Sequence, residues 1–205
     1  MLENEPLNIK RYLVGYSGHS YPIIEALHAF GFKFDGYFEG KEKGNNPYQI
    51  QYLGNENNFH FSNLDRIFVA IGDNYLRRKV LEKLDERVAV FSIIDSNSIV
   101  RSVISKEGIL VNAGAVIQPQ CSIGKGVIVN TRSVVEHECI IGDYVHIGPG
   151  AVVTGNVTIG ENTFIGANAT ILPGLSIGKN CIIGAGSVVT KNVNDNSVLK
   201  GNPAK

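Results

Sequence analysis

A six-residue period dominates the second half of the chain and limits what it can fold into. From Val111 to Val189, every sixth residue is Ile or Val, fourteen times in succession. The position two residues earlier is small or modestly apolar, and it includes Cys121, Cys139 and Cys181. Stacked hexapeptide repeats form parallel β-helices that bury one residue type on every repeat. We therefore expect three hexads per coil, with Ile and Val inside and the cysteines as core filler.

The residue that follows each inward position also shows a pattern. It is Gly in seven of the fourteen hexads and Asn in two more. Both residue types tolerate a positive φ, so this position is predicted to be a turn. Residues 95–106 are expected to form a lead-in coil, with Ile99 in the six-residue phase.

The first half alternates between short apolar strands and amphipathic helices. Strands are predicted over residues 10–15, 34–38, 66–71 and 88–94. Helices are predicted over 21–30, with Ile23, Ile24, Leu27 and Phe30 on one face, and up to Leu84, with Leu76, Val80, Leu81 and Leu84 on one face. This alternation predicts a small Rossmann-like parallel sheet that binds ligands at the carboxyl ends of its strands. We expect an α/β domain at 1–96 and a β-helix domain with a C-terminal tail at 97–205.

Several residues follow those strands directly and are candidates for ligand contacts. Ser17, Gly18 and His19 precede a helix, where backbone N–H groups bind anions. Glu39 follows the second strand, and Gly72 and Asn74 follow the third. Turn chemistry alone is the alternative for each of them. The N-terminal segment makes too small a sheet for a full dinucleotide domain, so redox use of NAD is not expected.

Composition excludes several classes of function. Nineteen basic and nineteen acidic residues leave no formal net charge, which argues against sequence-independent nucleic-acid binding. Three cysteines without a CxxC pair argue against a disulfide framework or a thiolate zinc site, and are typical of reduced thiols. No apolar run approaches the ~20 residues of a membrane span, and MLENEPLNIK does not resemble a signal peptide. A cytoplasmic protein is expected.

Chemistry on a β-helix must use outward positions, and the repeat contains two histidines. His137 lies between Glu136 and Glu138, and a carboxylate beside an imidazole favours a general base. The alternative is a solvated surface histidine. His146, one residue before Ile147, is also expected to point outward. Two histidines one and a half hexads apart are too few for a metal site within one subunit, so no metal is expected; a γ-type carbonic anhydrase is the zinc-dependent alternative.

Residues 130–150 (NTRSVVEHECIIGDYVHIGPG) resemble the catalytic segment of the bacterial nucleotide-aminosugar N-acetyltransferases. These are left-handed β-helix hexapeptide acyltransferases, closely related to the sialic-acid O-acetyltransferases. The opening YLVGYSGHS, the later AIGDN and the terminal GNPAK are also similar to that family, so the resemblance covers nearly the whole chain.

The resemblance implies direct acetyl transfer from acetyl-CoA, the co-substrate, to the amine of a nucleotide-linked amino sugar in glycan synthesis. A UDP-4-amino-4,6-dideoxy sugar is the expected acceptor. The alternatives are a sugar O-acetyltransferase and a non-catalytic nucleotide-sugar scaffold. A homotrimer is expected, because a lone β-helix offers the histidine no second wall.

The resemblance also assigns roles to residues. His137 is implied to be the base, with Glu138 orienting it and Asn130 lining the pocket, while His146 contacts coenzyme A or its thioester. Gly155 lies three hexads after His137 and is a candidate oxyanion donor through its N–H. Ala167 and Ala185 lie where the family's backbone meets pantetheine, with simple repeat packing as the alternative. The nucleotide sugar is implied to contact Ser17, Gly18, His19, Glu39, Gly72 and Asn74.

Overall fold

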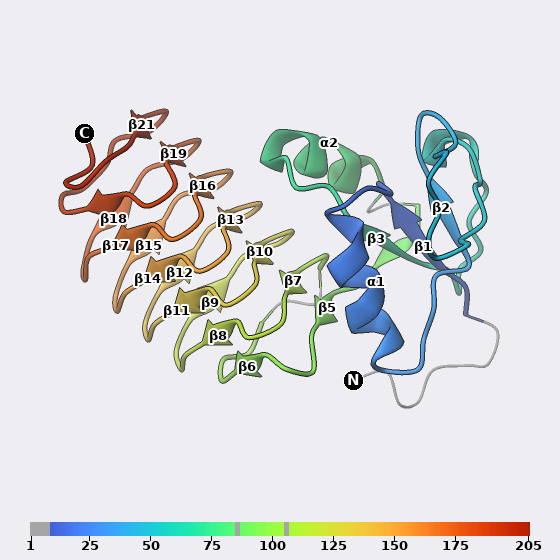
Figure 1. Cartoon of the computed structure of the whole chain (residues 1–205), viewed down its shortest axis with the longest axis horizontal. Coiled ribbons are helices and arrows are strands. Elements are labelled where there is room, and N and C mark those ends of the chain that lie inside the picture. Colours follow the sequence, from blue (N-terminus) through green and yellow to red (C-terminus); the bar gives the residue numbers. More distant parts are fainter. Residues whose placement is uncertain (1–8, 85–86, 105–106) are drawn as a thin grey trace.

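The computed structural model describes residues 9–84, 87–104 and 107–205. A small parallel sheet with two helices packs at one end of a β-helix, which runs to the C-terminus (Figure 1). The predicted fold class, an α/β region followed by a left-handed parallel β-helix, is confirmed.

The N-terminal sheet contains four strands in the order β2-β1-β3-β4, and all neighbouring strands are parallel. Its elements are β1 (Arg11–Val14), α1 (Ser20–His28), β2 (Gly36–Phe38), the 3-10 helix η1 (Glu56–Asn58), β3 (Arg66–Val69), α2 (Asn74–Leu84) and β4 (Ala89–Val90). The loops after β1, β2 and β3 leave the sheet at one edge, as expected for parallel strands.

The two helices bury different kinds of face. In α1, Ile23, Ile24 and Leu27 are buried, but Phe30 is 47% exposed because the helix ends at His28. In α2, the buried residues are Asn74, Arg77, Leu81 and Leu84, whereas Leu76 is 47% exposed and Val80 is half-buried. The prediction of an apolar α2 face is therefore wrong at Leu76. Two polar residues occupy that face, because the start of α2 packs against backbone carbonyl groups of the β-helix.

The β-helix is a triangular prism whose three faces are parallel sheets of two-residue strands (Figure 1). The first face contains β5 (Ile93–Ile94), β7 (Leu110–Val111), β10 (Ile128–Val129), β13 (His146–Ile147), β16 (Phe164–Ile165), β19 (Ile182–Ile183) and β21 (Val198–Leu199). The second contains β6 (Ile99–Val100), β8 (Val116–Ile117), β11 (Val134–Val135), β14 (Val152–Val153), β17 (Thr170–Ile171) and β20 (Val188–Val189). The third contains β9 (Ser122–Ile123), β12 (Ile140–Ile141), β15 (Thr158–Ile159) and β18 (Ser176–Ile177).

The hexad pattern predicts the interior of this prism correctly. All fourteen Ile and Val positions are at most 5% exposed, and they form one continuous apolar cluster. Paired strands are three hexads apart, as in Val129 beside Ile147. The three cysteines are free and buried, and each S–H donates to a backbone carbonyl group. Branched side chains of nearly equal size therefore fill each coil, with small residues in the remaining space.

The turn position differs from the prediction. Positive φ angles recur three residues after the inward position, at Gly114 and Glu138 for example, not one residue after it. The glycines directly after the inward residue have another function. A Cβ on Gly142 would lie 2.7 Å from the Glu161 backbone nitrogen of the next coil. These glycines therefore permit close contact between coils rather than a left-handed turn.

The hexad phase changes at both ends of the β-helix. Ile94 and Val100 pair with Val111 and Ile117, one residue short of three hexads, so Val100 packs inward and Ile99 is 49% exposed. The expectation that Ile99 keeps the phase is therefore wrong. The expected strand over 88–94 is also divided, because β4 joins the N-terminal sheet and β5 joins the prism. At the other end, Leu199 pairs with Ile183 at a spacing two residues short of three hexads.

Candidate functional site

His137 lies on the corner of the prism between β11 and β12, where the chain turns from the second face to the third. Its side chain is 60% exposed, and its Nδ1 lies 2.9 Å from Oε2 of Glu138. A carboxylate oxygen only accepts hydrogen bonds, so Nδ1 carries the proton and Nε2 keeps its lone pair in the neutral ring. Glu138 adopts a φ of 61°, the corner conformation. The ring is thus oriented by its neighbour and has a free basic nitrogen.

Gly155 lies directly beside this ring, one coil further along. A Cβ added to Gly155 would lie 2.6 Å from Cε1 and 2.7 Å from Nε2 of His137. The His137 ring can therefore occupy this position only because residue 155 has no side chain. Among the described residues, the Gly155 N–H donates no hydrogen bond, while its carbonyl group accepts one from Gly174. This unused donor lies in the same column of the prism as His137.

His146 has a different environment from the one expected. It starts β13 on the first face and points away from the prism, but its residue is only 7% exposed because the N-terminal region covers it. Its Nδ1 lies 3.1 Å from the Gly72 carbonyl oxygen, and its ring packs edge-to-face on Phe164. Burial, followed by the charge of Arg77, lowers the pKa of His146 to about 4. His146 is therefore a neutral, buried residue at neutral pH, not an exposed one.

Asn130 fixes the second nitrogen of this ring. Asn130 Oδ1 accepts from the Thr131 backbone N–H at 2.8 Å and from Asn112 Nδ2 at 2.8 Å. Its Nδ2 therefore faces His146 Nε2, at 3.1 Å. Since the Gly72 carbonyl group requires a proton on Nδ1, Nε2 accepts this hydrogen bond. The sequence predicted Asn130 beside the pocket of His137, but within one chain it contacts His146.

The residues at the carboxyl edge of the N-terminal sheet border the same region. The His19 ring lies 6.1 Å from that of His146 and about 3.8 Å from a Cβ built on Gly72. Burial, followed by Arg77, lowers the pKa of His19. Asn74 donates through Nδ2 to the carbonyl oxygens of Asn162 and Thr163, at 3.2 and 3.1 Å. His19, Gly72, Asn74, Asn130 and His146 thus gather where the sheet meets the prism.

The loop after β1 offers fewer anion-binding donors than expected. Ser17 and Gly18 are exposed, but the Ser17 N–H already donates to Ser20 Oγ at 3.1 Å. The N–H groups of Gly18 and His19 make no hydrogen bond to other described residues. Glu39 accepts from the Tyr16 N–H at 3.0 Å and pairs with Lys43 at 3.2 Å, both through Oε1. The Glu39 carboxylate therefore holds the loop after β1 through the Tyr16 N–H, in addition to lying at this edge of the sheet.

Ala167 and Ala185 occupy the corner between the first and second faces. They are three hexads apart in one column, where Ala167 is half-buried and Ala185 is exposed. Thr131, next to Asn130, belongs to the same column. The two alanines therefore lie along one small-residue edge that leads away from Asn130.

Arg77 is the central residue that sequence reasoning missed. It is 1% exposed and uses all five of its guanidinium donors. They bind the carbonyl oxygens of Gly126, Ile71, Gly72 and Tyr144 and the Oδ1 of Asn74, at 2.8–3.0 Å. From sequence alone, an arginine in a predicted helix is expected on the surface, because Arg is rarely fully buried. The one sequence feature that could indicate its burial is its position three residues after Asn74, which places both residues on the same face of the helix.

The structure thus forms two separate groups of predicted residues. His137, Glu138 and Gly155 lie on the corner opposite the first face, whereas His146, Asn130 and the sheet edge lie on the first face itself. A corner of a triangular prism does not contact the face opposite to it. One chain therefore does not bring the two groups together.

Three further features of the described residues concern metals, thiols and membranes. No cluster of three or more His, Cys, Asp or Glu side chains there is arranged to hold a metal ion. Burial raises the pKa of the Cys139 thiol to about 11, which makes it a poor nucleophile. None of the helices in the described ranges is long and apolar enough to cross a bilayer.

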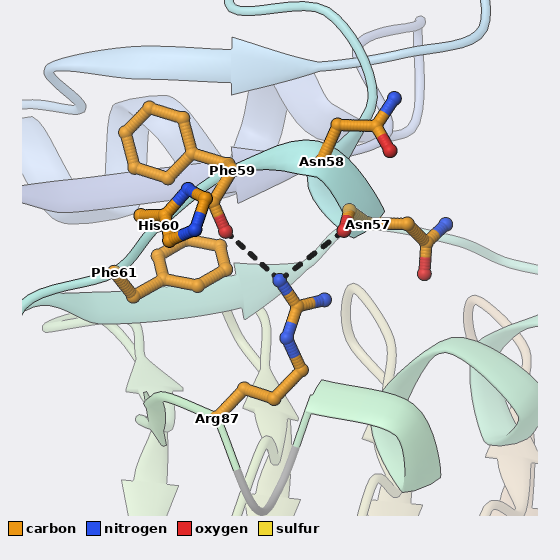
Figure 2. A pocket seen from close by; sticks show the side chains of 6 residues that line it. All are labelled: Asn57, Asn58, Phe59, His60, Phe61 and Arg87. Atoms are coloured by element: carbon orange, nitrogen blue, oxygen red, sulfur yellow. Dashed lines mark hydrogen bonds between the residues drawn. The ribbon is translucent and has the colours of Figure 1, made fainter.

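The N-terminal region also contains a hollow that is separate from both groups of predicted site residues. Figure 2 shows its lining residues, Asn57, Asn58, Phe59, His60, Phe61 and Arg87. Arg87 donates to the Phe59 carbonyl oxygen at 2.9 Å, so its guanidinium group already holds the segment that follows η1. None of the predicted site residues lines this hollow.

Three family models match the chain. Residues 10–84 match the PglD N-terminal domain, residues 121–155 match the bacterial transferase hexapeptide (six repeats), and residues 156–191 match the hexapeptide repeat of succinyl-transferase. Comparison with curated protein sequences gave no match.

Solved structures match over nearly the full length. One is a mutant of perosamine N-acetyltransferase from Caulobacter crescentus in complex with CoA and GDP-perosamine; it is 31% identical, the match covers 96% of this chain and 95% of that one, and the TM-score is 0.87. The acetyltransferase domain of PglB from Neisseria gonorrhoeae, in complex with acetyl coenzyme A, is 30% identical, with 96% and 98% covered and a TM-score of 0.88. WeeI from Acinetobacter baumannii is 26% identical, with 97% and 99% covered and a TM-score of 0.88.

Proposed function

Because the chain belongs to the hexapeptide family of bacterial nucleotide-aminosugar N-acetyltransferases, we propose that it acetylates the amine of a nucleotide-linked amino sugar with acetyl-CoA. The observation that carries this proposal is the exposed His137–Glu138 pair over Gly155. Sugar acetyl transfer from acetyl-CoA is the broader activity that the family supports. The amine as acceptor, and UDP as its nucleotide, are the finer parts of the proposal.

His137 acts as the general base. As the sugar amine attacks the thioester carbonyl carbon, a C–N bond forms and the amine proton passes to Nε2 of His137. Glu138 holds Nδ1 and stabilises the imidazolium that results. The tetrahedral intermediate then collapses, the C–S bond breaks, and the imidazolium returns the proton to the leaving sulfur as free coenzyme A thiol. No covalent enzyme intermediate is needed.

Gly155 supplies the oxyanion donor. Its N–H has no partner among the described residues and lies in the column of His137. A backbone N–H aimed at the developing oxyanion lowers the barrier, because it needs no reorganisation during the reaction. The same glycine therefore places the base and stabilises the charge.

A homotrimer completes the site. His137 lies opposite the first face, so it meets the His19–Asn130–His146 region only if a second copy packs its corner there. Coenzyme A then lies between two copies, with its pantetheine arm along Ala167 and Ala185. Ser17, Gly18, His19 and Glu39 contact the nucleotide sugar at the edge of the N-terminal sheet. Gly72 and Asn74 shape this edge from behind, because the Gly72 carbonyl group and the Asn74 amide are already bound within the chain. His146 contacts the coenzyme side of this region through its ring, because both of its nitrogens are engaged within the chain.

Mixed oligomers test the shared site. Oligomers of His137→Ala and of Asn130→Ala are each expected to have little activity. Co-assembly of the two variants restores activity if the residues act from different copies, since some sites then receive both native residues. Sedimentation should give a trimer; a monomer with full activity would exclude the shared site.

A panel of acceptors tests the reaction itself. UDP- and GDP-linked 4-amino sugars and their hydroxyl analogues are incubated with acetyl-CoA, and free thiol and product mass are measured. We expect thiol release with an amino sugar and an acetamide product. An ester product would identify the protein as an O-acetyltransferase, and nucleotide binding without any response to coenzyme A would indicate a scaffold.

A further inference from the structure

Arg77 joins three parts of the molecule at one buried point. Its Nε binds the Gly126 carbonyl oxygen and its Nη2 binds that of Tyr144, both on the β-helix. Its Nη1 binds the carbonyl oxygens of Ile71 and Gly72 in the loop between β3 and α2. Each bond is a charged donor on a neutral acceptor, the stronger kind of hydrogen bond. The loop after β3 is therefore held against the prism from within.

The Gly72 carbonyl oxygen connects this arginine to His146. It accepts from Arg77 Nη1 at 2.9 Å and lies 3.1 Å from His146 Nδ1. Both bonds approach the same oxygen, so the position of this carbonyl group is fixed from two sides. His146 is then fixed in turn by Asn130 Nδ2, at 3.1 Å from its Nε2.

We propose that Arg77 is a positioning residue, which holds the Gly72 carbonyl group so that His146 keeps its proton on Nδ1 and accepts from Asn130 on Nε2. The tautomer matters because it decides whether the amide nitrogen or the amide oxygen of Asn130 faces Nε2 of His146. One amide hydrogen of Asn130 binds His146, and the other makes no hydrogen bond to the described residues. In the Nε2–H tautomer, this arrangement would place two donors against each other, and the amide would have to turn.

The functional part of this inference rests on the proposed acetyl transfer, in which Asn130 and His146 border the coenzyme. With the ring fixed, the free amide hydrogen of Asn130 is a preorganised donor toward the bound substrates. Arg77 acts through Gly72 and His146 and touches neither substrate.

The tautomer is measured on the wild-type protein without any substrate. Nitrogen chemical shifts of the histidine side chains are recorded at pH 7, and His146 is assigned by comparison with His146→Gln. We expect a protonated Nδ1 and an unprotonated Nε2. A protonated Nε2, or an imidazolium, would overturn the proposal even if the enzyme is fully active.

Two arginine variants then test the coupling. Arg77→Lys keeps the charge but loses the planar fork, so His146 should populate both tautomers and kcat should fall on the order of tenfold. Arg78→Lys is the matched control, because Arg78 is half-buried on the same helix and pairs with Glu82 and Glu161 but contacts neither Gly72 nor His146. A purely structural role would lower the yield or the melting temperature but leave the tautomer and the kcat of the folded fraction unchanged.

If Arg77→Lys does not fold, the wild-type spectrum remains the deciding measurement, and Asn130→Asp tests the hydrogen bond on Nε2 of His146. A carboxylate only accepts hydrogen bonds, so it should draw a proton onto Nε2 of His146 and change the nitrogen spectrum. An unchanged spectrum would contradict the described contact. If no acceptor on the panel reacts, the proposed function fails, while the spectra of the wild type and of Arg77→Lys still decide the role of Arg77.

Discussion

Replacing Gly155 with Ala separates the position of the proposed base from the stability of the fold. The new Cβ would lie 2.6 Å from Cε1 and 2.7 Å from Nε2 of His137, well inside ordinary contact at 3.4 Å. The ring must therefore move by about 0.8 Å. Gly155 is not among the glycines with a positive φ, so alanine adds no backbone strain there.

The cost of this change should fall on catalysis. The His137 side chain is 60% exposed and is free to rotate away, so the free energy of unfolding should change by less than about 1 kcal/mol. A misplacement of about 1 Å in a reacting group can cost on the order of 10²-fold in rate, equivalent to about 2.7 kcal/mol of activation free energy. We therefore expect kcat to fall by roughly that factor.

The assay follows release of coenzyme A thiol at saturating acceptor and acetyl-CoA, with KM determined for both. KM should change little, because the substrates keep their binding surfaces. Gly44→Ala is the control, since a Cβ there meets nothing within 4 Å. Normal kcat in a folded Gly155→Ala protein would refute the idea that the ring must lie over Gly155. A large loss of stability would refute the idea that only a mobile side chain opposes the new methyl group.

Further predictions concern the interior, the corners, the carboxylate and the acid response. Ile183→Ala, fully buried, should lower the free energy of unfolding by about 2–5 kcal/mol, whereas Ile182→Ala, 48% exposed, should cost much less; equal losses in chemical denaturation would contradict the inward register. Gly142→Ala should destabilise by about 1–3 kcal/mol, because its Cβ meets backbone atoms that cannot rotate away; an unchanged melting temperature would argue against this contact. Glu138→Gln should lower kcat by on the order of tenfold with KM nearly unchanged, because the neutral amide cannot stabilise the imidazolium; an unchanged kcat would remove Glu138 from the mechanism. Burial holds the pKa of His146 at about 4 against 6.5, so the unfolded chain takes up the proton first as the pH falls. Stability should thus decrease between pH 6.5 and 4, by about 3 kcal/mol more than in His146→Gln, and equal pH dependence of the two proteins would contradict the neutral ring.

The sequence predicts the β-helix well because one residue type repeats at one spacing. Buried Ile and Val at every sixth position require a coil of three hexads, and the structure follows this from Val111 to Val189. The prediction fails where the spacing changes. A coil one residue short of three hexads moves the inward position from Ile99 to Val100, and no local preference in the sequence marks that missing residue.

The candidate site is less accessible to sequence reasoning, because it depends on contacts between distant segments. His137 beside Glu138 is visible as a motif of neighbouring residues, and their hydrogen bond is local. The burial of His146 depends on the loop after β3, which lies far earlier in the chain. The role of Arg77 cannot be predicted for the same reason, since most of its acceptors are backbone carbonyl groups that any residue can supply. Patterns of side chains cannot encode contacts made by the backbone.

Turnover by His137→Ala, with the best acceptor from the panel, is the decisive measurement for the proposed general base. Thiol release is measured beside the affinity for coenzyme A and the thermal stability of the same preparation. We expect kcat to fall by at least on the order of 10²-fold while affinity and stability are retained, because the ring is exposed and supports no part of the core. A kcat close to that of the wild type would contradict this expectation, since acetyl transfer would then proceed without the proposed base.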